Sequence, residues 1–165
     1  MQTSYNIEEP GLNVLPLGVE RYIVNGGGLT GLQIFPEDEI EIINNEGNQI
    51  CEISIFNKEG KSEPAILNLK ENKDSSEIKK ILSKKDESSL ISAYQLKKRS
   101  LDIANAKSSI IFDKDTSPGE KIKLNTKDKC YCIFSAPGPE MIIHEQNPPT
   151  DLTIFVKRAK ITKDK

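Results

Sequence analysis

Two cysteines, Cys130 and Cys132, lie two residues apart in a segment whose apolar residues alternate as in a β-strand. Residues i and i+2 of a strand point to the same face, so the two thiols share one face. Zinc binds thiolates, and a catalytic zinc keeps three protein ligands and a water molecule. Cys51 or His144 could supply the third ligand. In the competing interpretation all three cysteines are small buried hydrophobic residues, as free cysteines commonly are. We favour this second interpretation and predict that the domain binds no zinc.

The candidates for acid–base catalysis are Glu52 and His144, the one histidine of the chain. Histidine is the simplest general base near neutral pH. However, His144 ends a short apolar segment beside Glu145, where a surface side chain is the ordinary outcome. Glu52 lies in the middle of a strand; it would be a functional residue in a barrel lumen and an ordinary one on an outer face. The chain has no Gly-x-Ser-x-Gly motif, so no hydrolase-type serine nucleophile is indicated.

Three further motifs are interpreted as structural. The glycine-rich residues 26–31 lack the Lys-Ser/Thr pair of a P-loop, and they lead into a strand instead of the helix that a dinucleotide site requires. We interpret them as a turn. The acidic run at residues 37–41 and the basic cluster at residues 97–99 are interpreted as solvated surfaces, the second at the end of a helix.

Alternation of apolar and polar residues predicts a mainly β domain. The predicted strands lie at residues 21–24, 32–35, 39–44, 49–57, 109–113, 120–125, 130–135, 141–144 and 151–157. The turn Asn45-Glu46-Gly47 is short enough to join two of these strands, 39–44 and 49–57, as a hairpin with Gly47 at a positive φ. Helical spacing within residues 75–104 predicts one or two helices, the second with Leu90, Tyr94 and Leu101 near one stripe.

These elements predict an antiparallel sandwich or closed barrel with a short helical insert at about residues 75–104. We expect an extended N-terminal segment over residues 1–20, a single domain over 21–158, and a charged tail or linker over 159–165. The alternation also predicts the buried core, which comprises Ile40, Ile42, Cys51, Ile53, Ile55, Ile122, Leu124, Ile154 and Val156.

The composition excludes several classes of function. The 165 residues suffice for one domain, and 36% of them are hydrophobic. With 23 basic and 25 acidic residues the net charge is −2, which argues against a nucleic-acid partner. No apolar run is long enough to span a membrane, and no signal peptide is visible at the N-terminus. We therefore expect a cytoplasmic protein without nucleic-acid or membrane partners; homo-oligomerisation stays open.

The segment from residue 37 to residue 57 resembles the urea-carboxylase-associated family. The hallmark of that family is a hairpin whose second strand begins Gly-Asn-Gln and continues through a carboxylate to an aromatic residue and Asn. The matching residues here are Gly47, Asn48, Gln49, Glu52, Phe56 and Asn57, with Glu52 where the family usually has Asp. The resemblance is specific over roughly 20 residues and implies a β-rich, barrel-like domain in which Gly47, Asn48, Gln49 and Glu52 are candidate ligand-binding residues.

The resemblance also implies a functional context. Family members are subunits of carboxyguanidine-deiminating enzymes. A similar domain precedes a folate-binding, aminomethyltransferase-like domain in trimethylamine-oxide-demethylase-like proteins, and it holds a zinc with cysteines in its later half. Here Cys130 and Cys132 lack the His-Asp and Gly-x-Cys surroundings of that site, so the resemblance indicates a divergent member that has lost its metal.

Three functional hypotheses follow. In the first, which we favour, the chain is an accessory or N-terminal β-domain of a larger one-carbon enzyme. It has no cofactor or catalysis of its own, and its partner is a folate-binding domain or subunit that takes tetrahydrofolate. In the second, it binds a small polar ligand. In the third, it is a zinc-dependent lyase or amidohydrolase-like domain that uses Cys130, Cys132 and Cys51, with Glu52 as the acid–base residue.

Overall fold

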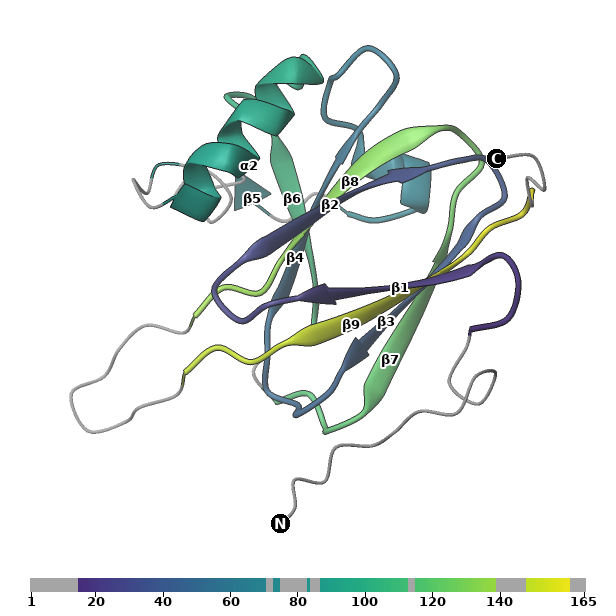
Figure 1. Cartoon of the computed structure of the whole chain (residues 1–165), viewed down its shortest axis with the longest axis vertical. Coiled ribbons are helices and arrows are strands. Elements are labelled where there is room, and N and C mark those ends of the chain that lie inside the picture. Colours follow the sequence, from purple (N-terminus) through teal and green to yellow (C-terminus); the bar gives the residue numbers. More distant parts are fainter. Residues whose placement is uncertain are drawn as a thin grey trace.

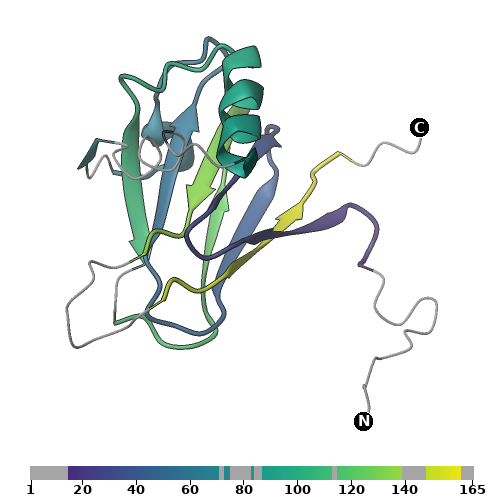
Figure 2. The same cartoon turned by 60° about the vertical axis from the view of Figure 1, so that its left-hand side comes forward.

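The computed structural model describes residues 15–70, 73–74, 83, 87–112, 115–138 and 148–160 and shows two antiparallel sheets (Figure 1). The first sheet has the order β1 (Val19–Val24), β9 (Leu152–Lys157), β3 (Glu39–Asn44) and β7 (Glu120–Asn125). The second has the order β2 (Leu29–Ile34), β8 (Cys130–Ser135), β4 (Cys51–Phe56), β6 (Lys107–Phe112) and β5 (Lys73–Asp74). The two sheets pack face to face without closing on each other (Figure 2). The predicted sandwich is therefore confirmed, and the closed barrel is wrong.

The core lies between the sheets and is built by the predicted alternation. In β3 and β4, every second side chain points into the core, because successive residues of a strand face opposite sides. The predicted core residues Ile40, Ile42, Cys51, Ile53, Ile55, Leu124, Ile154 and Val156 are all buried. Ile122 is the exception, because it is only partly buried at the side of the core.

We expect Ile53→Ala to lower the free energy of unfolding by about 2–4 kcal/mol, because Ile53 is fully buried and its loss leaves a cavity between the sheets. Urea denaturation at a constant m-value measures the change. The exposed Lys121→Ala in β7 is the control and should change stability by less than about 0.5 kcal/mol. An equally small change for Ile53→Ala would show that this side chain does not face the core.

The predicted hairpin between residues 39–44 and 49–57 is wrong. Strand β3 pairs with β7 and β9, whereas β4 pairs with β6 and β8, so the chain crosses from one sheet to the other between these strands. In a sandwich the apolar face of a strand points to the same core whether the next strand of the chain lies in the same sheet or in the opposite one. Alternation therefore predicted which side chains are buried and could not predict the pairing partner.

The crossing from β3 to β4 is a tight corner held by buried amides. Gly47 has the predicted positive φ, 75°. The side chain of Asn44 donates from Nδ2 to the carbonyl of Gln49 at 2.8 Å. Gln49 in turn donates from Nε2 to the carbonyl of Pro137, and its Oε1 accepts from the backbone N–H of Thr150, both at 2.8 Å. The corner is thus fastened to both segments that flank residues 139–147.

Helix α2 (Glu87–Lys98) lies over the outer face of the second sheet (Figure 2). It contacts that face through Leu96, which packs with Phe56, Ala106 and Ile133 in a second apolar cluster. The predicted stripe is not the buried face, because Leu90 and Tyr94 are more than half exposed. The helix packs on the sheet near its C-terminal end, through Leu96 and through the partly buried residues that follow the helix. An apolar face along the whole helix is therefore not required for this packing.

The acidic run at residues 37–41 is not uniformly solvated, which corrects the prediction for Asp38. Asp38 is buried, and its carboxylate accepts hydrogen bonds from Arg158 at 2.8 Å and from the backbone N–H groups of Phe35 and Ala159 at 2.9 Å. Arg158 also donates to Glu20 at 2.8 Å. This network, formed by Glu20, Asp38 and Arg158, joins the end of β9 to β1 and to the turn between β2 and β3.

Some predictions fall outside the described residues. These are the predicted strand at 141–144, with His144, and most of the predicted helix at 75–85. In the part of the chain that the structure describes, no helix combines the length and apolar character needed to cross a membrane.

Candidate functional site

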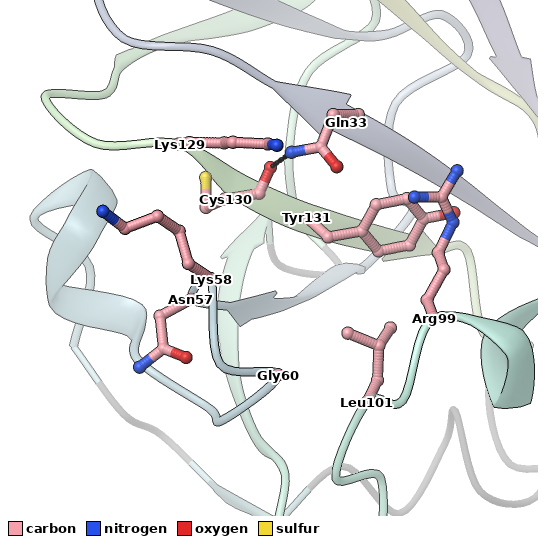
Figure 3. Close-up of a pocket in the computed structure, with 9 residues that line it drawn as sticks. All are labelled: Gln33, Asn57, Lys58, Gly60, Arg99, Leu101, Lys129, Cys130 and Tyr131. Atoms are coloured by element: carbon pink, nitrogen blue, oxygen red, sulfur yellow. Dashed lines mark hydrogen bonds between the residues drawn. The ribbon is translucent and has the colours of Figure 1, made fainter.

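A hollow lined by basic side chains lies beside β8, on the outer side of the second sheet (Figure 3). We call it the cationic hollow. Its volume is about 210 Å³. The turn after β4, the segment after α2, strand β2 and the start of β8 contribute its lining residues, which are Gln33, Asn57, Lys58, Gly60, Arg99, Leu101, Lys129, Cys130 and Tyr131.

The turn after β4 and the segment after α2 are joined by backbone contacts. The N–H of Asp102 donates to the carbonyl of Gly60 at 2.8 Å. Asn57 shapes the turn itself, because its Oδ1 accepts from the N–H groups of Glu59 and Lys61 at 3.0 Å. These bonds hold Lys58 and Arg99 on neighbouring segments, although they lie 41 residues apart in the sequence.

Tyr131 and Arg99 form one wall of the cationic hollow. The guanidinium carbon of Arg99 lies 4.2 Å from the centre of the Tyr131 ring, within the range of a cation–π contact. The ring lies across Gly31 of β2, where any side chain would collide with the phenol. Burial raises the pKa of Tyr131, although the nearby Arg99 opposes the shift. The phenol therefore stays protonated at neutral pH and can donate a hydrogen bond.

Gln33 gives the hollow a fixed amide. Its Nε2 donates to the backbone carbonyl of Cys130 at 2.8 Å (Figure 3). A carbonyl can only accept, so this bond fixes which end of the amide carries the hydrogens. The Oε1 atom then lies on the opposite side of the amide and can accept a hydrogen bond from a bound molecule.

The charges of the hollow all have one sign. Lys58, Arg99 and Lys129 are basic, and none of its lining residues is acidic. Within the described residues, none of these three side chains forms an ion pair. Three cations in the lining of a small hollow favour a negatively charged ligand. The arrangement can therefore bind an anion.

Reasoning from the sequence missed this site. The three cations come from separate segments, so no local spacing connects them. Arg99 belongs to the basic cluster at residues 97–99, which was interpreted as a solvated helix end. All three side chains are exposed, as predicted, and Arg99 also lies over the ring of Tyr131. The one available signal is that this cluster lies at the C-terminal end of a helix, and that signal does not reveal the partner ring.

The two cysteines of β8 do lie together, as predicted, but in the core between the sheets. Their sulfur atoms are 3.8 Å apart, which is about the distance between two thiolates on one tetrahedral zinc. Cys51 does not join them. Cys132 lies opposite Ile55 of β4, and Cys51 is four residues further along that strand, about 13 Å away. The described residues contain no group of three metal-ligating side chains, so they do not form a zinc site by themselves.

The pKa values of the three thiols shift in different directions. Burial, and then the nearby Glu52, raise the pKa of the Cys51 thiol. The hydrogen bond with Cys130, together with burial, raises the pKa of Cys132 well above its usual range. The hydrogen bond with Cys132 lowers the pKa of Cys130, although burial opposes that shift. Zinc requires thiolates, so Cys51 and Cys132 resist the proton loss that zinc binding needs, whereas Cys130 favours it. His144, the other candidate ligand and the candidate general base, lies outside the described residues.

Glu52 is fully buried, although it alternates with core residues and therefore points away from the core. Its Oε1 accepts a hydrogen bond from the hydroxyl of Ser108 at 2.7 Å, and the hydroxyls of Ser54 and Ser108 lie 3.0 Å apart. A buried carboxyl group needs such polar partners. This cluster joins β4 to β6 and is separate from the lining of the cationic hollow. A catalytic or ligand-binding role for Glu52 stays a prediction.

The other candidate ligand-binding residues, Gly47, Asn48 and Gln49, form the corner between the sheets. Gln49 is buried, and Asn48 is exposed with a positive φ of 58°. The N–H of Asn48 donates to the carbonyl of Thr116 at 2.7 Å. None of the three lines the cationic hollow. Their role in ligand binding also stays a prediction, while their contacts within the protein are those of a corner.

Comparison with known proteins identifies one relative. The chain is 30% identical over 153 residues to trimethylamine-oxide aldolase of Ruegeria pomeroyi. The match covers 93% of this chain and 19% of that enzyme, so the chain spans about a fifth of the length of the curated relative that it matches. No family model matches the chain, the urea-carboxylase-associated family included. The chain is therefore related to a segment of a trimethylamine-oxide-processing enzyme.

Proposed function

We propose that this chain is an accessory β-domain of a larger enzyme of the trimethylamine-oxide-aldolase type, without catalysis of its own. The observation that carries the proposal is the match to that enzyme, which includes nearly all of this chain and only a fifth of the relative. Such a match is typical of one domain in a multidomain protein.

The placement of the reactive side chains supports an accessory role. Cys130 and Cys132 lie in the core, Cys51 lies at the far end of β4 from them, and Glu52 is buried against serine hydroxyls. A catalytic centre needs its nucleophile, its acid–base group and its ligands to converge on a place that a substrate can reach. The described residues do not bring these groups together in that way.

The proposal also names a partner. The resemblance noted in the sequence places a folate-binding, aminomethyltransferase-like domain or subunit beside domains of this kind. In our proposal that partner takes tetrahydrofolate and performs the one-carbon chemistry in the cytoplasm. This domain itself binds neither zinc nor folate.

We expect the isolated chain to leave trimethylamine oxide unchanged, which proton NMR of the methyl signals can follow. The full Ruegeria enzyme serves as the positive control in the same buffer. Addition of zinc should not produce turnover. Turnover by the isolated chain that Cys130→Ser or Cys132→Ser abolishes, while the variants stay folded, would contradict the accessory role and support the zinc-dependent alternative.

A further inference from the structure

We propose that the cationic hollow binds a small organic dianion, either a short dicarboxylate or a phosphate monoester. The observation that carries this inference is that Lys58, Arg99 and Lys129 all line one hollow, with no acidic residue among its lining side chains. The chain as a whole is slightly acidic, with a net charge of −2, so this positive charge is a local feature. The inference does not depend on the proposed accessory role.

The number of charges favours a dianion over a monoanion. A single carboxylate would neutralise one of the three cations and leave the positive charge of the other two in the lining of the hollow. Two negative charges reduce that repulsion and allow each anionic oxygen to be approached by more than one donor. Both carboxylate and phosphate groups offer the paired oxygens that a guanidinium binds with two parallel hydrogen bonds.

The remaining walls favour an organic ligand over an inorganic ion. The Tyr131 ring and the side chain of Leu101 present apolar surface beside the cations. The phenol of Tyr131 can donate a hydrogen bond to an anionic oxygen of the ligand. A volume of about 210 Å³ lies below the range of about 300–1,000 Å³ that holds drug-sized ligands, so it suits a small metabolite.

Arg99 is the residue on which binding should depend most. Its contact with the Tyr131 ring orients the planar guanidinium before any ligand arrives. A preorganised group loses less conformational entropy on binding than a free side chain does. All three cations are exposed, but the ring contact of Lys129, with Phe35, is longer at 5.7 Å, and none is recorded for Lys58 among the described residues. Each lysine should therefore contribute less than Arg99.

Isothermal titration of the full 165-residue chain at low salt tests the inference. The probes are succinate, phenyl phosphate and acetate. We expect succinate or phenyl phosphate to bind at least about tenfold more tightly than acetate, and sodium chloride to weaken that binding. Arg99→Gln should weaken it by about tenfold or more, and Lys58→Gln and Lys129→Gln by about three- to fivefold each. Preference for succinate would identify a dicarboxylate site, and preference for phenyl phosphate a phosphate-ester site.

The control is Lys121→Gln, which removes a charge from β7 in the other sheet and should change affinity by less than about twofold. If Arg99→Gln lowers the thermal midpoint of unfolding, the double variant Lys58→Gln/Lys129→Gln takes its place in the comparison. Two results would overturn the inference: neither dianion binds more tightly than acetate, or the variants of the hollow bind the dianion as tightly as Lys121→Gln does.

Discussion

Arg158→Ala is expected to lower the free energy of unfolding by about 3–5 kcal/mol, because it leaves the buried carboxylate of Asp38 without its cation. Burial disfavours the charged guanidinium, but the hydrogen bonds to Glu20 and Asp38 outweigh it and raise the pKa of Arg158. Arg158 also donates to the carbonyl of Gln33 at 2.9 Å, so one side chain fastens β9 to β2 as well. Urea denaturation measures the change.

A surface ion pair provides the matched control for that variant. Lys123 lies 3.9 Å from Glu41, and 63% of its side chain is exposed. Lys123→Ala should therefore change the free energy of unfolding by no more than about 0.5 kcal/mol. Equal effects of the two variants would show that the network around Asp38 is no stronger than a surface pair.

Gly47→Ala should destabilise the protein by about 3–5 kcal/mol, because two separate penalties act at the corner between the sheets. The positive φ of 75° costs an L-residue roughly 1–2 kcal/mol. A Cβ atom would also lie 2.7 Å from the carbonyl oxygen of Thr116 and from the nitrogen of Pro118, and neither backbone group can move without opening the corner. The thermal midpoint and the urea midpoint should both fall.

Gly119→Ala separates the two penalties. Gly119 has nearly the same φ, 78°, but a Cβ atom there would meet nothing within 4 Å. We expect it to cost only the roughly 1–2 kcal/mol of the backbone term. If Gly47→Ala were no more destabilising than Gly119→Ala, the close packing at the corner would not contribute to stability.

These variants also show how far the fold could be predicted. Alternation placed β3 and β7 at their observed residues and identified nearly all of the core, because burial of one strand face leaves a direct record in the sequence. Pairing leaves no such record. The apolar face of a strand points to the same core whichever sheet the next strand joins, so alternation did not distinguish a hairpin at Gly47 from the observed corner.

The candidate site was less accessible to such reasoning. The i, i+2 spacing placed Cys130 and Cys132 on one face correctly, because that depends on local geometry alone. The cationic hollow depends on tertiary structure, which brings Lys58, Arg99 and Lys129 together from three segments. Asp38 shows the same limit, since its neighbours in the sequence suggested a solvated surface and its partner lies 120 residues away.

The central proposal is that this chain serves as one accessory domain of an enzyme of the trimethylamine-oxide-aldolase type and does not perform the chemistry. The most direct measurement replaces the matching segment of the Ruegeria enzyme with this chain and compares trimethylamine oxide turnover with that of an enzyme lacking the segment. We expect the replacement to restore turnover of trimethylamine oxide. A replacement that carries Gly47→Ala, which destabilises the domain, should restore less turnover than the unaltered chain does. A folded replacement that is as inactive as the deletion would contradict the account.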